Sequence, residues 1–471
     1  MGELGSMGAW AAGGRPGGGA GGRRCRVRRR RVLDATGSPC GPDIPGSAGR
    51  HARAGRLAVS PAAARMAVAD HGTFDRDIGD VPARSVDDAR AWLRERLEPI
   101  GSAERPLAEV VGATLAGPLT TATALPRVDT AAMDGYAVCG SGPWVLRDDT
   151  RVAGTHGGRP LESGQAVRIA TGAPAPAGST AVIRDEFIST STLSGETLVI
   201  RDPDAPVRDD TRRRGENWAP GARLAAAGTR VSGAVVSAAL SAEMHAVPVR
   251  GPLRADVLIT GSEIRAEGPL TPGQTRDAIG PVLPGYLRAC DIETTHVWRL
   301  DDCRELLGSW FALRSDAELV VVVGATGRGA ADHLRALLSG LGAEILIDGL
   351  TIRPGGSQLV ALLPDGRVLL ALPGNPFAAI AALLITGPAI VDARTARTPT
   401  EPLRGRIADS SGTQDRHTRV VPVCQQPGGV WHSTGPVHTP HLASLISAQA
   451  LALLPPKSGR GTLVELIPIP R

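Results

Sequence analysis

The second half of the chain alternates between short, mostly apolar runs and glycine loops. Such runs end at Gly261 (LRADVLITG), Gly324 (AELVVVVG) and Gly374 (RVLLALPG), and each precedes a segment of helical character. Strands buried on both faces have this pattern, and the repeat of strand, glycine loop and helix predicts a parallel α/β sheet. Ligands bind at the carboxyl ends of the strands in such sheets. We therefore expect the glycine loops to share one ligand-binding edge.

The rest of the chain predicts one helix and two β regions. The stretch SVDDARAWLRERLEPI (85–100) predicts a helix that Ser85 caps, with Asp88 completing a capping box. Short apolar runs between turn residues predict a small β domain from about 140 to 205, and the same pattern returns over 395–471. The expected fold class is therefore multidomain, α/β and β.

Composition supports a globular protein of several domains. The chain has 471 residues, 42% of them hydrophobic and 21% charged, and this length corresponds to about three or four domains. The longest apolar run (377–391) contains Gly387-Pro388, and we expect it to break there and to be too short to span a membrane. The six cysteines lack zinc-ligand or disulfide spacing, which suits a reducing cytoplasm. We expect a soluble, cytoplasmic protein with no membrane partner.

The net charge of +5 is concentrated at the N-terminus. Residues 1–65 hold twelve arginines against Glu3, Asp34 and Asp43, a net of +9, which leaves −4 for the remainder. This Arg/Gly-rich segment cannot bury a core, so we interpret it as a disordered or spurious extension, with Met66 as the alternative start. Arginine-rich segments also occur in organelle transit peptides. The mildly acidic remainder predicts no nucleic-acid partner.

The stretch DTAAMDGYAV (129–138) combines residues that no simple element needs. A core strand would not carry Asp134 and Gly135 in its middle, because both residue types are depleted in strand interiors. A surface turn would not need Met133 and Tyr136. The pattern indicates an acid that a glycine turn and two large side chains hold for a purpose other than packing.

The expected ligand edge carries groups that bind anions. GATGRGAAD (324–332) offers a run of backbone N–H groups, and PGNP (373–376) places a rigid turn before a helix N-terminus. Arg353, in TIRPGG, is a fork-shaped donor suited to phosphate or another oxyanion. Taken alone, a glycine-rich loop after a strand is more often only a tight connection between two elements than a binding site. Together they indicate a site for a phosphorylated or otherwise anionic ligand, with Mg²⁺ held by carboxylates such as Glu263.

Several longer segments resemble the molybdopterin molybdenumtransferases of the MoeA family, which include the E domain of gephyrin. The segments that carry the resemblance are PRVDTAAMDGYAV (126–138), VRIATGAPAPAGSTAVIRDE (167–186), RRRGENWAPGARLAAAGTRV (212–231), VLITGSEI (257–264) and LPGNPFAAI (372–380). The resemblance covers about residues 80 to 470. It implies an N-terminal region (80–252) with an inserted β domain (about 140–210), an α/β molybdopterin-binding domain (253–392) and a small C-terminal β domain (395–471).

The resemblance also implies a reaction: insertion of molybdate into adenylylated molybdopterin, with Mg²⁺-dependent release of AMP. It implies a homodimer whose active site lies between the α/β domain of one subunit and the MDGYA and TGA segments of the other. By resemblance the catalytic residues are Asp134, Thr171 and Arg168. We expect Mg²⁺ near Asp332 and Glu263. The residues expected to bind molybdopterin or phosphate are Gly261, Ser262, Gly324, Thr326, Gly327, Arg328, Arg353, Pro373, Gly374 and Asn375.

Some positions depart from the family pattern. Asn217 and Ser262 stand where the family usually has acids, and Gly349 and Gly356 stand where lysines are common. Losing two carboxylates lowers the charge that attracts Mg²⁺. The alternative interpretation is therefore a divergent, non-catalytic MoeA-like paralogue that binds molybdopterin or a partner protein. A single-domain adenylyltransferase is a third interpretation, which the additional domains disfavour.

Overall fold

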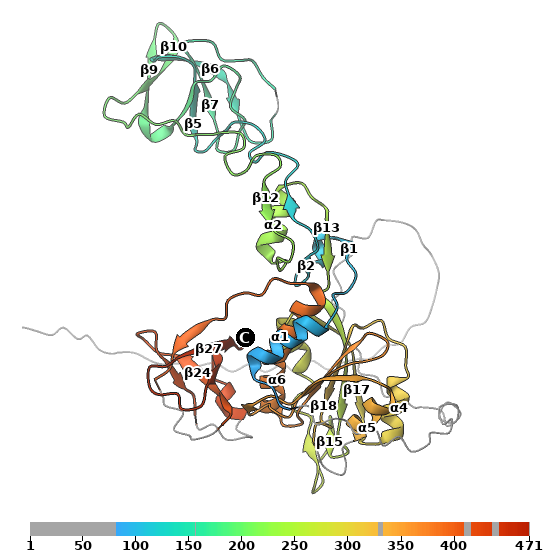
Figure 1. Ribbon diagram of the computed structural model, residues 1–471. Coiled ribbons are helices and arrows are strands. Elements are labelled where there is room, and N and C mark those ends of the chain that lie inside the picture. Colours follow the sequence, from blue (N-terminus) through green and yellow to red (C-terminus); the bar gives the residue numbers. More distant parts are fainter. Residues whose placement is uncertain (1–81, 156, 328–332, 409–415, 436–441, 471) are drawn as a thin grey trace, which may run out of the picture. The chain divides into compact units, whose positions relative to one another are not determined.

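The computed structural model (Figure 1) describes residues 82–155, 157–327, 333–408, 416–435 and 442–470. The arginine-rich segment 1–65, Arg328 and Asp332 lie outside the described residues. The described residues form β sheets and a helix-covered α/β sheet. This confirms the multidomain α/β and β fold class expected from the sequence.

Helix α1 (Val86–Arg96) is the helix predicted near residue 85. Ser85 Oγ accepts the N–H of Asp88 at 3.1 Å and donates to the Asp88 carboxylate at 2.6 Å. The predicted N-cap is thus confirmed, although Asp88 bonds the Ser85 hydroxyl and not its N–H. The buried residues of α1 are Val86, Ala89 and Leu93. Helix α1 packs beside α6 (Pro376–Thr395) in the largest core (Figure 1).

The N-terminal region contains small antiparallel sheets. The three-stranded sheet has the order β1-β13-β2, with helices α2 (Gly233–Ser241) and η2 (Leu107–Glu109) beside it. Its strands are β1 (Ala103–Pro106), β2 (Thr114–Leu115) and β13 (Ala246–Arg250). Two further ladders pair β3 (Leu119–Thr120) with β12 (Arg223–Ala225) and β4 (Thr130–Ala131) with β11 (Thr211–Arg212).

A six-stranded sheet lies within this region, in the order β8-β5-β7-β6-β10-β9. Its strands are β5 (Gly135–Val138), β6 (Trp144–Arg151), β7 (Gln165–Ile169), β8 (Ala181–Arg184), β9 (Ile188–Leu193) and β10 (Glu196–Arg201), with η3 (Asp185–Phe187) after β8. Asp134 directly precedes β5, and Gly135 opens it. A Cβ atom on Gly135 would lie 2.1 Å from the carbonyl oxygen of Ile183, so only glycine fits between β5 and β8.

The α/β sheet has the order β17-β14-β18-β22-β21-β19. Strands β17 (Ile292–Leu300), β14 (Leu253–Thr260), β18 (Leu319–Val323) and β22 (Val368–Leu372) run parallel. Strands β21 (Leu359–Leu362) and β19 (Glu344–Asp348) are antiparallel additions. The three apolar runs that end in glycine form β14, β18 and β22, which are adjacent. The sequence therefore predicted the parallel centre of a sheet that is mixed at one side.

Helices cover both faces of this sheet, as the buried strand pattern predicts. Along β18, Leu319, Val321 and Val323 pack in the core with α1, α3 (Leu283–Ala289) and α6. Val320 and Val322 pack on the other face with α4 (Arg304–Phe311) and α5 (His333–Gly340). A short ladder of β15 (Ile264–Arg265) and β16 (Thr275–Arg276) follows β14.

Helix α6 corrects one expectation from the sequence. It continues through Gly387 and Pro388 for 20 residues and does not break there. It is the one described helix long and apolar enough to cross a membrane, but 83% of its most apolar 18-residue stretch is buried inside the structure. Its apolar character on all sides is that of a core helix.

The C-terminal sheet has the order β20-β24-β26-β27-β23, with β25 beside β24. Its strands are β20 (Ile352–Arg353), β23 (Arg404–Arg406), β24 (Thr418–Gln425), β25 (Trp431–Ser433), β26 (Ala450–Leu454) and β27 (Leu463–Pro468), and η4 (Leu442–Leu445) precedes β26. Strand β20 comes from the α/β segment and pairs in parallel with β24, with Ile352 opposite Thr418 and Arg353 opposite Arg419. This pairing brings the TIRPGG segment against the C-terminal sheet.

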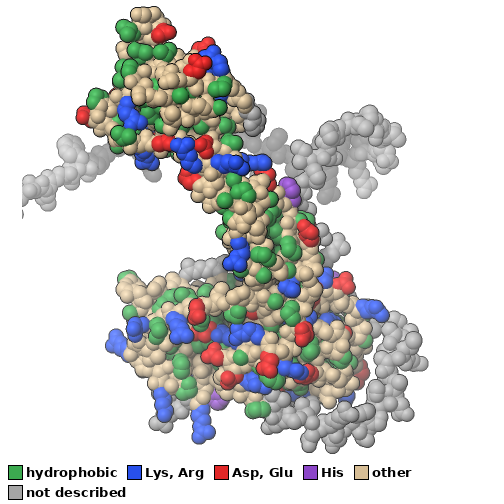
Figure 2. Space-filling view, turned by 45° about the horizontal axis from the view of Figure 1, so that its top comes forward, with side chains coloured by type: hydrophobic (Ala, Val, Ile, Leu, Met, Phe, Trp, Pro, Cys, Tyr) green, Lys and Arg blue, Asp and Glu red, His purple; other side chains and the backbone are tan. Residues whose placement is uncertain are grey.

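Basic and acidic side chains are interspersed on the face of the molecule in Figure 2. Elsewhere among the described residues such side chains form ion pairs, as Arg90 does with Glu465 at 2.7 Å and Arg96 with Glu344 at 2.5 Å. The described residues of this face therefore form a mixed surface.

Candidate functional site

Three glycine loops meet at the carboxyl ends of β14, β18 and β22. Gly324 has a φ of +95° and donates its N–H to the carbonyl of Leu372 at 3.0 Å. A Cβ atom on Gly324 would lie 2.6 Å from Thr260 Oγ1, and one on Gly374 would lie 3.8 Å from the Gly324 Cα. The close approach needs glycine at Gly324, and the structure places the loops at one edge as the sequence predicted.

A cavity of about 530 Å³ lies beside this edge, and we call it the strand-end pocket. The 350–357 segment and the PGNP turn form most of it. Its lining residues are Leu350, Ile352, Arg353, Pro354, Gly355, Gly356, Ser357, Pro373, Asn375, Ala378 and His417. None of these described lining residues is an acid, and Arg353 and His417 are the two that can carry positive charge. The lining suits an anionic ligand.

The N-terminus of α6 opens onto this pocket. Asn375 caps the helix by accepting the N–H of Ala378 on its side-chain oxygen at 3.0 Å. The first N–H groups of a helix carry partial positive charge, which favours an anion at this end. The PGNP turn therefore contributes both lining atoms and a favourable potential to the strand-end pocket.

Gly349 and Gly356 stand beside Arg353 at positions where the family commonly has lysines, and the backbone at both positions disfavours a side chain. Gly349 has a φ of +100°, a conformation that residues with side chains rarely adopt. A Cβ atom on Gly356 would lie 2.5 Å from the carbonyl oxygen of Ile352. The Leu350 N–H also donates to the Gly356 carbonyl at 2.9 Å, which closes the segment on itself. At these two positions the chain therefore differs from the family pattern in two ways: its backbone is more tightly constrained, and it lacks the positive charge of the lysines.

The remaining residues expected at this edge lie at the strand ends but do not line the pocket. Ser262 and Glu263 are exposed, and Ser262 Oγ accepts the N–H of Asp302 at 3.3 Å. A Cβ atom on Gly261 would lie 2.9 Å from Glu263 Oε2, so the Glu263 side chain folds back over the loop. Among the residues that the structure describes, no three His, Cys, Asp or Glu side chains gather where they could hold a metal.

The loop after β18 is held by a salt-bridged arginine. Arg335, on α5, donates to the carbonyl oxygens of Thr326 and Gly327 at 3.4 and 3.0 Å. Its Nη2 also donates to Asp348 at 2.6 Å. These contacts hold the second half of the GATG segment (324–327). Sequence reasoning did not identify Arg335, because a charged helical residue usually lies on a solvated face.

The second group of expected residues lies at the start of β5 in the six-stranded sheet. Thr171 donates its N–H to Asp134 Oδ1 at 2.6 Å and its hydroxyl to the same oxygen at 2.8 Å. These hydrogen bonds, and then the nearby Arg168 charge, hold the pKa of Asp134 below its usual value. Asp134 is exposed. The structure therefore presents an ionised carboxylate to solvent.

Arg168 lies beside this acid on β7. It forms a bidentate pair with Asp185 at 2.6 Å for both bonds, and its guanidinium lies 4.9 Å from the centre of the Tyr136 ring. The large side chain at Tyr136 thus supports Arg168, which gives a structural reason for a tyrosine next to Asp134. The structure brings together all three residues that the resemblance names as catalytic.

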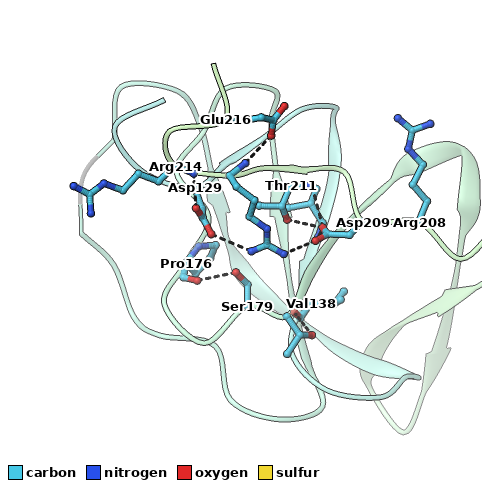
Figure 3. Close-up of polar contacts among 12 residues, drawn as sticks. Asp129, Val138, Pro176, Ser179, Arg208, Asp209, Thr211, Arg214 and Glu216 are labelled. Atoms are coloured by element: carbon cyan, nitrogen blue, oxygen red, sulfur yellow. Dashed lines mark hydrogen bonds and ion pairs between the residues drawn. The ribbon is translucent and has the colours of Figure 1, made fainter. Parts of the chain in front are cut away.

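An arginine between two aspartates secures the segment that leads to Asp134 (Figure 3). Arg213 donates to Asp129 Oδ2 at 3.0 Å and to Asp209 Oδ2 at 2.5 Å, and the Arg214 N–H donates to Asp129 Oδ1 at 2.8 Å. The Arg214 N–H and the Arg213 side chain lower the pKa of Asp129. The sequence singled out the RRRGE run only as part of the family resemblance, and the acceptors Asp129 and Asp209 were not identified from it.

The two segments around Asp134 and Thr171 also pair through their backbones. The Ala131 N–H donates to the Ala173 carbonyl at 3.0 Å, and the Gly172 N–H donates to the Ala131 carbonyl at 2.8 Å. The Ala175 N–H donates to the Asp129 carbonyl at 2.8 Å. The MDGYA and TGA segments therefore position each other.

Comparison with known families matches most of the body of the chain. Residues 84–242 match the family described as MoeA N-terminal region (domain I and II), and residues 256–391 match the family described as Probable molybdopterin binding domain. The chain is 28% identical over 397 residues to the molybdopterin molybdenumtransferase 2 of Mycobacterium tuberculosis, covering 79% of this chain and 95% of that protein. It is 28% identical over 296 residues to the molybdopterin molybdenumtransferase of Synechococcus elongatus, covering 59% of this chain and 72% of that protein.

Solved structures show the same fold. Two crystal structures of the molybdopterin biosynthesis MoeA protein from Pyrococcus horikoshii align with 82% of this chain and with 99% and 100% of those chains. Their TM-scores are 0.60 and 0.63, at 22% and 20% sequence identity. These likenesses support the multidomain architecture.

Proposed function

The chain belongs to the MoeA family, and from that membership we infer that it is a molybdopterin molybdenumtransferase. The observation that carries this function is the similarity to named transferases over 79% of the chain. The residues that the family resemblance marks as catalytic also lie in hydrogen-bonded contact. The substrates we propose are adenylylated molybdopterin and molybdate, both anionic.

The strand-end pocket is the part of the chain that we assign to anion binding. Arg353 supplies permanent charge, the α6 N-terminus supplies the positive end of its dipole, and the described lining holds no acid to repel an anion. Burying a phosphate or molybdate oxygen against these donors orients the substrate without any proton transfer. In this proposal the pocket binds and positions, and the acid at residue 134 acts on the reacting groups.

Asp134 is suited to that second role because it stays ionised. Both hydrogen bonds from Thr171 go to Oδ1, which leaves Oδ2 for a substrate group or a water molecule. A fixed carboxylate can accept a proton from attacking water or orient it, provided that substrate comes within hydrogen-bond reach. Arg168 is held nearby by Asp185, and there it contributes to the lowered pKa of Asp134.

Mg²⁺ dependence is a separate proposal. The described residues do not form a ligand set on their own, and we derive no step through a metal. A Mg²⁺ ion bound with substrate needs only one or two protein carboxylates, because phosphate oxygens and waters complete its shell. Glu263 is exposed at the strand ends and is compatible with such a contribution. When bound, the ion would neutralise phosphate charge as AMP leaves.

We also propose a homodimer in the cytoplasm. The family resemblance supports the dimer, since it places Asp134 of one subunit against the α/β domain of the other. The cysteines in the described part of the chain, Cys139, Cys290, Cys303 and Cys424, are free, as suits a reducing compartment. The non-catalytic alternative is motivated by Asn217 and Ser262, where the family usually has acids.

One experiment separates the transferase from that alternative. The protein is incubated with adenylylated molybdopterin, molybdate and Mg²⁺, AMP release is followed, and the product is tested for activation of a cofactor-free molybdoenzyme. We expect AMP release that needs Mg²⁺, together with active cofactor. Tight substrate binding without AMP release would instead establish a non-catalytic relative.

A further inference from the structure

A buried glutamine links the core helix α6 to the wall of the strand-end pocket. Gln358 is fully buried, immediately precedes β21, and follows Ser357, which lines the pocket. Thr386, in the middle of α6, is also buried and donates its hydroxyl to Gln358 Oε1 at 2.6 Å. Gln358 Nε2 in turn donates to the Gly355 carbonyl at 3.3 Å. The amide therefore connects a core helix with a lining segment, although Gln358 does not line the pocket itself.

The two partners fix the orientation of this amide. A backbone carbonyl can only accept, so the amide NH2 group faces Gly355 and the amide oxygen faces the Thr386 hydroxyl. The residues that precede Thr386 on α6, 377–385, are all buried and apolar. An apolar side chain would fill the core at this point without the cost of burying polar groups. The polar pair is therefore explained by the segment that it orients and not by packing.

Both walls of the pocket depend on α6. The PGNP turn leads directly into this helix and forms one wall. On the other wall Gly355 lies against the first turns of α6, because a Cβ atom there would be 3.2 Å from the Ala378 carbonyl oxygen and 3.3 Å from the Ala382 nitrogen. The Gln358 amide thus holds the second wall against the helix that forms the first.

The lining segment 350–357 is attached at both of its ends. Near its start, the Thr351 carbonyl accepts the Thr418 N–H at 2.9 Å, and β20 pairs with β24. Near its end, the attachment is the Gln358 amide. Arg353 lies between the two attachments. Losing the amide would release the turn after Arg353 and leave the pairing of β20 with β24 in place.

We propose that Gln358 is a positioning residue of the transferase: through the Gly355 carbonyl it fixes the turn after Arg353 against α6 and so sets the affinity for adenylylated molybdopterin. The inference rests on the proposed function in treating the strand-end pocket as the substrate site. It goes beyond that function by assigning the affinity in part to a buried pair, Gln358 and Thr386, that touches no substrate.

The test separates Km from kcat in the AMP assay with the full chain. Gln358→Met keeps the length of the side chain and removes the donor to Gly355, and Thr386→Val removes only the hydroxyl. We expect Gln358→Met to raise the Km for adenylylated molybdopterin about fivefold and to leave kcat within about twofold, because fewer molecules hold the binding-competent turn before substrate arrives. Thr386→Val should raise Km less. The double variant should match Gln358→Met, since Thr386 acts only through the amide.

Thr395→Val is the matched control on the same helix. Thr395 is buried near the end of α6 remote from the PGNP turn, where its hydroxyl donates to the Val391 carbonyl at 2.7 Å and lies 2.8 Å from Thr114 Oγ1. Like Gln358→Met, this variant loses a buried hydrogen bond and should have a lower unfolding midpoint. Its Km should equal that of the wild type, because no lining segment depends on Thr395.

The outcomes keep this inference apart from the proposed function. An unchanged Km in Gln358→Met, an equal rise in Km for Thr395→Val, or a double variant with the summed effects of the two single ones would overturn the inference. Dissociation constants for adenylylated molybdopterin, measured by calorimetry, give the same comparison without turnover. AMP release with a Km insensitive to Gln358 leaves the transferase standing, whereas Gln358-dependent binding without AMP release removes the transferase and leaves the positioning role.

Discussion

Thr171 donates both its backbone N–H and its hydroxyl to the same oxygen of Asp134, at 2.6 and 2.8 Å. The contact joins two segments that are far apart in the sequence and leaves the carboxylate exposed. A structural acid would normally be buried among its donors, so the arrangement favours a carboxylate that is held for a substrate.

Replacing Asp134 should abolish the reaction without affecting the fold. Asp134→Asn keeps the size of the side chain but cannot accept a proton from water, so we expect AMP release to fall by about a thousandfold. Because Asp134 is exposed, thermal unfolding should stay unchanged. Retained AMP release in this variant would remove Asp134 from the chemistry.

The hydroxyl of Thr171 should set the acid side of the pH profile. The pKa of Asp134 is lowered by the Thr171 N–H and hydroxyl, so the ionised form persists as the pH falls, until it is lost through that lowered value. Thr171→Val removes the hydroxyl and keeps the N–H, and it should move the loss of activity to higher pH. AMP release by Thr171→Ser should follow the wild-type profile. The assay is a pH series of kcat for the three proteins.

A buried aspartate at the junction of the N-terminal region and the α/β domain should matter for stability. Asp291 accepts hydrogen bonds from Arg230 at 2.6 and 2.5 Å and from Arg397 at 2.7 Å, and Arg397 also donates to the Gly112 carbonyl at 2.8 Å. The Asp291 and Arg397 side chains are 7% and 10% exposed. Asp291→Asn would leave the buried Arg397 charge with only the more distant Asp392, at 3.9 Å, and we expect a loss of about 3 kcal/mol in the free energy of unfolding.

Urea denaturation measures that loss, and an exposed pair provides the control. Arg127 and Glu243 form a salt bridge at 2.5 Å, with side chains 63% and 48% exposed. Arg127→Gln should therefore cost less than about 1 kcal/mol. Equal destabilisation by the two variants would mean that the Asp291 contacts contribute no more than a surface ion pair.

Restoring a lysine at Gly349 should not improve the enzyme. Gly349 has a φ of +100°, and a side chain in that conformation costs about 1–3 kcal/mol. We expect Gly349→Lys to lower the unfolding midpoint and to leave the Km for adenylylated molybdopterin no better than that of the wild type. Gly459, which has open space where a Cβ would lie, is the control, and Gly459→Lys should be nearly neutral. A tighter Km in a stable Gly349→Lys protein would show that the lost charge matters more than the backbone.

The sequence predicted what depends on local pattern. The apolar runs before Gly261, Gly324 and Gly374 predicted adjacent parallel strands, and the glycines followed from the close approach at the strand ends. The family motifs correctly grouped Asp134 with Thr171, although only the structure shows the hydrogen bonds. The expected break at Pro388 was wrong, because burial on all sides of α6 outweighs the local cost of a proline.

The missed residues depend on long-range pairing. His417 enters the strand-end pocket only because the two residues of β20 join the C-terminal sheet, and a ladder that short has no sequence signature. Asp129 and Asp209 are ordinary surface acids by composition, and only the folded chain brings them to Arg213. Asp332, expected near Mg²⁺, lies outside the described residues, so its role stays a prediction.

The proposed dimer predicts complementation between two inactive variants. Asp134→Asn leaves the strand-end pocket intact, and Arg353→Ala leaves Asp134 intact. If one site combines the pocket of one subunit with the acid of the other, a mixed dimer contains one complete site and one site with both defects. Unfolding and refolding an equal mixture produces about half mixed dimers, so about a quarter of wild-type AMP release should return. Each variant refolded alone is the control, and no recovery in a mixture shown to contain mixed dimers would place Asp134 and Arg353 of the same subunit in one site.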